Sequence, residues 1–366
     1  MRKWLVLATW CCLVAIHGTA RSAPWSPLEI DVWEPPFNTT HQRTQQQYTA
    51  LTKAAKAWRL CVAIPHLKDA YWLAVNFALI NEARRLGVAL DIVEAGGYEH
   101  LDVQRQQVSG CMQQGYDALI IGAVSATGLN DLIVKSVAAG HPVIDLINGI
   151  DSPQITARVA ADFYDLGSAV GRYIRAQAAT GAKPVTVAWL PGPQGAGWVA
   201  AGDRGFRDSL KNVSVSIVDT RYGDTGFAAQ GSLIKDILAR HPDVDYIVGT
   251  AVTAEAAVQY LRKVKNKHTK VLAYYFGPAV NRGIRRGTIV AALYLRRPPV
   301  VAPLAIAGVV LGFVGRSKEP AAVTTANWAI VVGFLSLFGW VLLAVGAALF
   351  ALPWALGAWG FAAFLG

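Results

Sequence analysis

The chain has 366 residues, which is long enough for two domains. Hydrophobic residues make up 53% of it and charged residues only 16%, whereas soluble globular chains carry about 25% charged residues. This composition excludes a disordered chain and an ordinary cytosolic enzyme, and it suggests that part of the chain meets lipid. The formal net charge is +10, but Lys and Arg are scattered rather than grouped in blocks, which argues against nucleic acid as a partner.

The N-terminus has the pattern of a secretory signal peptide over residues 1–22. Arg2 and Lys3 precede an apolar run over 4–16, and residues 18–20 supply the small side chains that a signal peptidase needs. A plain membrane anchor is the alternative, but the run is shorter than the roughly 20 residues that span a bilayer. We therefore expect a secreted chain, with an N-terminal extension over 23–55 before the first domain.

The cysteines bear on the compartment as well. Cys11 and Cys12 lie inside the apolar run of the signal peptide, so its removal leaves Cys61 and Cys111. In an oxidising compartment these two can form one disulfide. Two buried free thiols are the alternative, and the sequence favours neither.

From residue 56 the chain alternates short apolar runs with longer amphipathic stretches. Strands are predicted over 59–65, 88–94, 118–121, 142–147, 185–190, 213–218, 246–249 and 271–275. Helices are predicted over 70–86, 102–114, 129–139, 164–178, 200–211, 227–239 and 253–264. This alternation is typical of α/β proteins whose parallel sheets are covered by helices on both faces.

The pattern divides into two α/β units that meet near residues 148–158, so we expect two lobes, each with a doubly wound parallel sheet, joined by a hinge. The first lobe is assigned to 56–149 and the second to 150–272. Residues 273–293 are expected to return to the first lobe, and 294–366 form a hydrophobic, helical tail.

Aromatic residues gather where such a fold binds its ligands, at the carboxyl ends of the parallel strands. The segments after the predicted strands are 68–72, 95–98, 148–151, 162–164 and 274–276. Any one of these aromatic side chains alone fits a place in the core or at its rim. Their concentration at several strand ends favours a binding site.

Motifs spread over residues 50–292 resemble the TorT family of the type I periplasmic binding proteins, which are similar in fold to ribose-binding protein. The segments that carry the resemblance are 57–61 (AWRLC), 67–73 (LKDAYWL), 94–98 (EAGGY), 143–151 (VIDLINGID), 190–193 (LPGP) and 282–287 (RGIRRG). The resemblance implies a protein that binds trimethylamine N-oxide between its lobes and works with a membrane histidine kinase of the TorS type.

The resemblance also implies which residues contact the ligand: Asp69, Tyr71, Trp72, Tyr98, Phe163 and Tyr275. Ring faces suit a methylated ammonium, at roughly 0.5–2 kcal/mol for each cation–π contact, and Asp69 stands at an acidic position that could attract the cationic centre. Phe163 departs from the family, which usually has Trp there. Sugar-binding relatives carry polar side chains near Ala251 and Val252, where this chain is apolar.

No pattern indicates an enzyme, a metal or a cofactor. The glycine-rich segment 192–197 lacks the Lys-Ser/Thr of a phosphate-binding loop, so it is interpreted as a tight turn. The histidines show no metal-binding spacing, and no cysteine pair has zinc spacing. His66 and His100, which lie near strand ends, are interpreted as surface residues rather than as general bases.

The C-terminal segment departs from the family pattern near Ala292. Residues 298–315 and 320–366 contain no charged side chain. The run over 328–350 is long enough for one transmembrane helix, whereas 300–314 is marginal and fits a soluble helix pair equally well. Residues 351–365 could add a short segment. A gene fusion or a shifted reading frame is the alternative to an evolved membrane anchor.

These patterns together predict a non-enzymatic periplasmic sensor that a tail could tether to the inner membrane. The alternative is the solute-binding subunit of an ABC importer for a sugar or a small polar solute.

Overall fold

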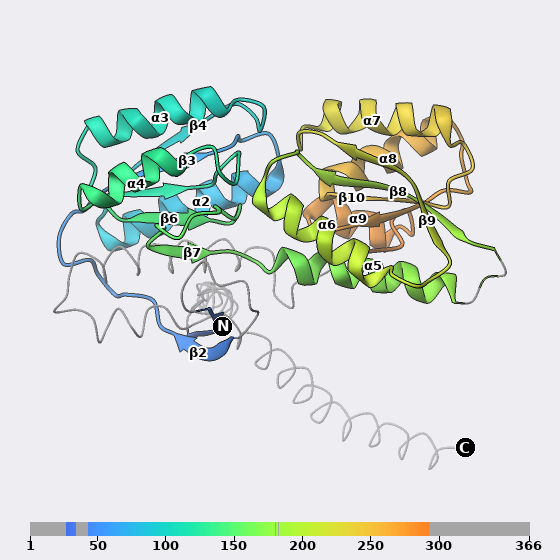
Figure 1. Ribbon diagram of the computed structural model, residues 1–366, viewed down its shortest axis with the longest axis horizontal. Coiled ribbons are helices and arrows are strands. Elements are labelled where there is room, and N and C mark those ends of the chain that lie inside the picture. Colours follow the sequence, from blue (N-terminus) through green and yellow to red (C-terminus); the bar gives the residue numbers. More distant parts are fainter. Residues whose placement is uncertain (1–26, 34–42, 180, 182, 293–366) are drawn as a thin grey trace, which may run out of the picture.

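Two five-stranded parallel sheets form two lobes that lie side by side (Figure 1). The computed structural model describes residues 27–33, 43–179, 181 and 183–292. The predicted α/β fold with two parallel sheets is confirmed. The signal peptide and the hydrophobic tail that the sequence predicts lie outside the described residues.

The first lobe contains β3 (Arg59–Ile64), α2 (Ala70–Leu86), β4 (Ala89–Glu94), α3 (Leu101–Gln113), β5 (Ala118–Ile121), α4 (Asn130–Ala138), β6 (Val143–Leu146) and β7 (Ala157–Val159). The strand order is β4-β3-β5-β6-β7. Because successive side chains of a strand point to opposite faces, β3 builds two cores. Leu60 and Val62 pack with α2, while Cys61 and Ala63 pack with α3 and α4.

The second lobe contains α5 (Phe163–Ala178), β8 (Val185–Gly192), α6 (Gly197–Ser209), β9 (Val215–Tyr222), α7 (Phe227–Arg240), β10 (Tyr246–Gly249), α8 (Ala251–Lys263), β11 (Lys270–Ala273), α9 (Pro278–Arg285) and β12 (Ala291–Ala292). The strand order is β12-β11-β10-β8-β9. Side chains of β8 also point alternately to the two faces of their sheet. Val187 and Trp189 pack against α5 and α6, while Ala188 and Leu190 pack against α7 and α8.

The N-terminal extension contains an antiparallel pair that the sequence did not indicate, β1 (Leu28–Val32) and β2 (Thr44–Tyr48). Leu28 and Tyr48 are fully buried in the core of the first lobe. Arg43, just before β2, forms ion pairs with Asp162 and Asp165 at the start of α5. The extension therefore contacts both lobes.

Two of the predicted boundaries are wrong. β7 belongs to the first sheet, although the second lobe was expected to begin at residue 150. This three-residue strand has no apolar run, and Arg158 at its centre donates from Nε to Asp145 Oδ2 on β6 at 2.6 Å. At the other end, β12 pairs with β11 in the second sheet, so the described part of 273–293 does not return to the first lobe.

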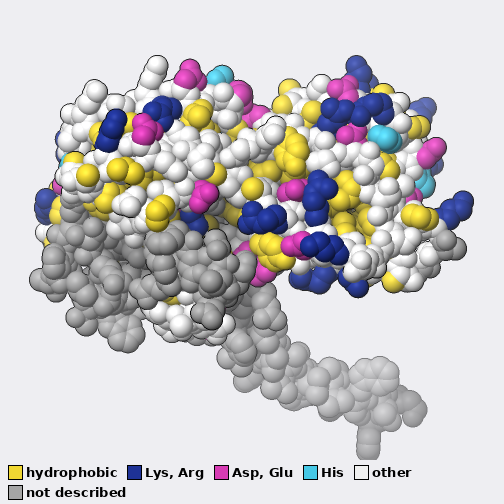
Figure 2. All heavy atoms as spheres, in the orientation of Figure 1, with side chains coloured by type: hydrophobic (Ala, Val, Ile, Leu, Met, Phe, Trp, Pro, Cys, Tyr) yellow, Lys and Arg dark blue, Asp and Glu magenta, His cyan; other side chains and the backbone are white. Residues whose placement is uncertain are grey.

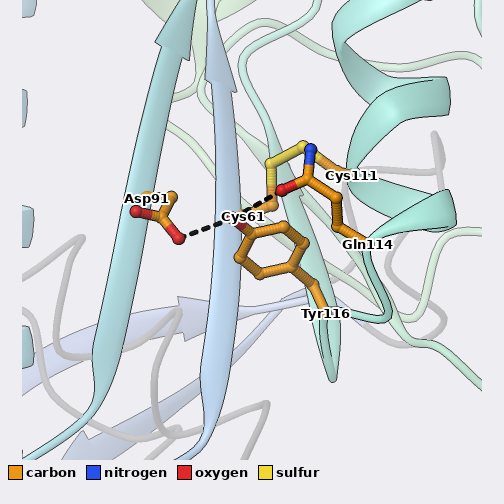
Figure 3. The surroundings of a disulfide bond; sticks show 5 residues. All are labelled: Cys61, Asp91, Cys111, Gln114 and Tyr116. Atoms are coloured by element: carbon orange, nitrogen blue, oxygen red, sulfur yellow. Dashed lines mark hydrogen bonds between the residues drawn. A yellow bond between two sulfur atoms is a disulfide. The ribbon is translucent and has the colours of Figure 1, made fainter.

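Cys61 on β3 and Cys111 on α3 form a disulfide, with their Cα atoms 6.1 Å apart (Figure 3). The sequence left this pairing open against two free thiols. Beside the bond, the Tyr116 hydroxyl donates to Asp91 Oδ2 on β4 at 2.5 Å, and this hydrogen bond raises the pKa of Tyr116. The disulfide joins α3 to β3, and the Tyr116–Asp91 hydrogen bond joins the loop after α3 to β4.

Among the described residues, none of the helices combines the length and the apolar character that a membrane span requires. Figure 2 shows Lys and Arg side chains interspersed with Asp and Glu over the second lobe in that view. This mixed face agrees with the scattered charges of the sequence.

The disulfide should stabilise the first lobe, because it joins residues 50 positions apart and restricts the unfolded chain. Replacing both cysteines with alanine is expected to lower the free energy of unfolding by about 2–4 kcal/mol. Urea unfolding of the double variant and of the wild type checks this. Reduced wild-type protein should unfold like the variant, and equal stability of the oxidised wild type and the variant would contradict the expectation.

Candidate functional site

The loops at the carboxyl ends of the two sheets contact each other across the border between the lobes. The backbone N–H of Trp198 donates to the Asn148 carbonyl at 2.8 Å, and that of Ala126 donates to the Gly195 carbonyl at 2.9 Å. A Cβ on Gly197 would lie 2.0 Å from the carbonyl oxygen of Gly149. Only glycine permits this approach, so the tight turn predicted over residues 192–197 serves the contact between the lobes.

The structure brings the predicted aromatic residues together at this border. Tyr71 and Trp72 come from the start of α2, and Tyr98 from the loop after β4. Tyr275 follows β11 in the second lobe, and its ring centroid lies 6.2 Å from that of Tyr71. Phe163 begins α5. Both lobes therefore contribute ring faces to one cluster.

Trp198, which was not among the site residues predicted from the sequence, lies at the centre of this cluster. Its ring centroid is 5.5 Å from that of Phe163, 6.2 Å from that of Tyr275 and 6.3 Å from that of Tyr98. It is only 4% exposed. The available signal was its place directly after the glycine-rich turn, at the start of a helix.

Asp69, the predicted acidic group, is buried beside these rings. Its Oδ1 accepts the backbone N–H of Trp72 at 2.9 Å and so caps the N-terminus of α2. Its Oδ2 accepts the hydroxyl of Thr225, which belongs to the second lobe, at 3.2 Å. The carboxylate of Asp69 therefore caps α2 and accepts a hydrogen bond from the second lobe, in addition to lying beside the ring cluster.

Burial raises the pKa of three tyrosines in the cluster, Tyr71, Tyr98 and Tyr275, and the charge of Asp69 raises each of them further. These hydroxyls therefore stay protonated at neutral pH and can donate hydrogen bonds. The cluster offers ring faces, neutral hydroxyl donors and one carboxylate. This combination suits a small ligand with a cationic, methylated end and a hydrogen-bond acceptor.

His66 differs from the expectation that it is a surface residue, because its side chain is 0% exposed. The loop between β9 and α7 covers it, and its Nε2 lies 2.8 Å from the Thr225 hydroxyl oxygen. Burial lowers the pKa of His66; Lys68 lowers it further, while Asp69, Asp224 and Glu94 raise it. His100, by contrast, has a side chain that is 46% exposed.

Other features of the described residues do not compete with this cluster. A groove of about 790 Å³ lies between α7 and α8, and it shares no residue with the cluster. Within the described ranges, no group of three or more His, Cys, Asp or Glu side chains could hold a metal ion.

The stability of the protein should fall as the pH drops below about 6.5, the ordinary pKa of histidine. Because the pKa of His66 is lowered on folding, the unfolded chain binds a proton that the folded protein does not, and acid favours unfolding. His66→Gln should reduce the loss of free energy of unfolding between pH 7.5 and 5.5, measured by urea titration. His100→Gln, at an exposed position, is the control, and equal pH slopes in all three proteins would contradict the expectation.

The chain as a whole is similar to known proteins. Residues 60–309 match the family described as "Periplasmic binding protein domain". "Periplasmic protein TorT" of Escherichia coli (strain K12) is 41% identical over 249 residues, which are 68% of this chain and 71% of TorT.

Two solved structures are similar as well. An ABC transporter solute binding protein from Bradyrhizobium sp. BTAi1, with bound Bis-Tris, has 41% sequence identity and a TM-score of 0.64, over 81% of this chain and 88% of that one. The complex of the TorS sensor domain with TorT in the presence of TMAO has 28% identity and a TM-score of 0.58, over 72% of this chain and 86% of that one.

Proposed function

Because the chain belongs to the TorT branch of the periplasmic binding protein family, we propose that it is a periplasmic sensor. It binds trimethylamine N-oxide (TMAO), or a related methylated amine, between its lobes and performs no chemistry on it. A membrane histidine kinase of the TorS type then reads the closed arrangement of the lobes. The observation that carries the proposal is the buried ring cluster that both lobes build beside Asp69.

The chemistry of the cluster matches that of a methylated amine oxide. The methyl groups next to a positive nitrogen favour the faces of aromatic rings, which Tyr71, Trp72 and Trp198 provide. The oxide oxygen needs donors, and the protonated hydroxyls of Tyr71 and Tyr275 can supply them, whereas the hydroxyl of Tyr98 already donates to Asn148 Oδ1 at 3.4 Å. The negative charge of Asp69 favours an orientation with the nitrogen and its methyl groups toward the carboxylate.

The structural similarity to an ABC transporter solute binding protein favours a second candidate. In that case the chain delivers a sugar or small polar solute to an importer. A sugar needs buried polar partners for its hydroxyls, and residues 251 and 252 of this chain are Ala and Val. Calorimetry with TMAO and a panel of sugars separates the two. Binding of a sugar without binding of TMAO would overturn the sensor proposal.

The proposal includes a tether to the inner membrane through residues 294–366, chiefly 328–350. The long run without a charged residue supports it. The full-length protein should therefore stay with the membrane fraction during osmotic shock, and its release into the shock fluid would refute the tether. Resequencing the gene near codon 292 tests the alternative of a shifted reading frame.

Removing one ring of the site should weaken TMAO binding. Tyr71→Ala is expected to cost about 1–2 kcal/mol of binding free energy, measured by calorimetry, through lost cation–π and packing contacts. Phe77→Ala is the matched control, because Phe77 lies on the same helix and is 63% exposed. Trp72→Ala should weaken binding at least as much, but Trp72 is 3% exposed in the core, so its fold must be checked by circular dichroism. Unchanged TMAO affinity in both site variants would exclude the ring cluster as the binding site.

Phe163 gives a test in the opposite direction. Phe163→Trp should tighten TMAO binding by about 0.5–1 kcal/mol, because indole offers a better face to a cation than phenyl. The ring of Phe163 packs against that of Trp198 at the centre of the cluster. The same calorimetric titration measures this change in affinity. A clear loss of affinity with an intact fold would show that residue 163 does not offer a ring face to the ligand.

A further inference from the structure

The loop between β9 and α7, residues 223–226, joins the second lobe to the residues that flank the ring cluster. Thr225 in this loop is 2% exposed, and its hydroxyl oxygen contacts His66 Nε2 at 2.8 Å and Asp69 Oδ2 at 3.2 Å. Asp224 accepts from Lys68 Nζ at 3.0 Å and from the backbone N–H of Tyr98 at 3.3 Å. Both residues therefore contact the first lobe directly.

The directions of these hydrogen bonds follow from their partners. His66 Nδ1 accepts the backbone N–H of Lys68 at 3.2 Å, so the hydrogen of the neutral imidazole is on Nε2. His66 then donates to the Thr225 hydroxyl oxygen, and Thr225 donates its own hydrogen to Asp69. In this chain of hydrogen bonds each donor is used once, and the last acceptor is a carboxylate, to which hydrogen bonds are strongest.

The loop is fixed within its own lobe. Gln230 Nε2 donates to the Asp224 carbonyl at 2.8 Å, and its Oε1 accepts the Thr253 hydroxyl at 2.7 Å. Thr253 shares a capping box with Thr250 at the start of α8. The loop is therefore held in its lobe by a connected set of hydrogen bonds that reaches the start of α8.

We propose that Thr225 is a positioning residue that links closure of the lobes to the carboxylate of the ligand site. When the lobes separate, water can solvate Asp69 Oδ2. When they close, this oxygen is buried and needs a donor, which Thr225 supplies from the opposite lobe. Without that hydroxyl the closed state carries a buried carboxylate oxygen that has lost its donor, and the equilibrium moves toward the open state.

The effect on the ligand rests on the proposed function, whereas the effect on closure does not. A ligand that binds the closed state has an apparent dissociation constant inversely proportional to the closed population. Loss of the Thr225 hydroxyl should therefore weaken TMAO binding by the factor by which it reduces the closed population.

The test compares Thr225→Val, which keeps the shape and removes the hydroxyl, with Thr225→Ser, which retains it. Thr220→Val is the matched control, since Thr220 is in the same lobe and its hydroxyl accepts only one bond that the structure shows, from Arg207 Nη2. Spin labels on Lys135→Cys and Lys235→Cys, two exposed positions on different lobes, report closure as a distance distribution in the full-length protein without ligand. Calorimetry with TMAO gives the affinities.

We expect the closed-to-open ratio of Thr225→Val to fall about tenfold, and its TMAO affinity to fall by the factor by which its closed population falls. Thr225→Ser and Thr220→Val should resemble the wild type. Equal distance distributions in Thr225→Val and the wild type would overturn the proposal, as would a Thr225→Ser variant that behaves like Thr225→Val. If the wild type does not bind TMAO, the proposed ligand is wrong, and the distance distributions still decide the role of Thr225.

Discussion

The buried carboxylate of Asp69 connects three features of the structure: the start of α2, the ring cluster and the contact between the lobes. A carboxylate removed from water is costly unless its oxygens are hydrogen-bonded. Here one oxygen accepts the N–H of Trp72 at the start of α2, where the helix dipole also favours a negative charge. The other accepts Thr225. A change at position 69 therefore alters three features at once.

The ring faces of the second lobe are supported from beneath by its core. Tyr274 stacks on Trp198, with ring planes 18° apart and centroids at 6.3 Å, and meets Trp189 at 5.5 Å. A Cβ on Gly202 would lie 1.6 Å from the Tyr274 hydroxyl oxygen, so the helix leaves room for that ring. Because these aromatic rings are already packed, ligand binding orders few side chains and loses little entropy.

Much of the fold could be predicted from the sequence because buried strands and amphipathic helices leave periodic patterns. β3, β5, β6 and β10 are runs of buried residues, and all were predicted. β7 and β12 were not, since strands of two or three residues have no period to detect. They are defined by their pairing with neighbours that lie elsewhere in the chain.

The predicted site residues share a property that sequence reasoning can use, because aromatic side chains at strand ends are unusual. Thr225 and His66 carry no such signal. A threonine in a loop is ordinary, and a lone histidine beside a strand end is usually exposed, yet folding buries both by bringing residues 66 and 225 within one hydrogen bond of each other. Contacts between lobes depend on the tertiary arrangement, which no local pattern encodes.

The contacts between the two lobes also determine how far a ligand can shift the equilibrium between the open and closed states. A ligand shifts an equilibrium only by its difference in affinity for the two states, and moving a population from 1:99 to 99:1 requires roughly 5.5 kcal/mol. The contacts of Trp198 N–H, Ala126 N–H and Thr225 with the opposite lobe favour closure independently of any ligand. The Lys68–Asp224 pair adds little, because the Lys68 side chain is 40% exposed and water screens it. The few buried hydrogen bonds therefore bias the resting equilibrium toward closure, and a ligand shifts it further only to the extent that it binds the closed state more tightly than the open one.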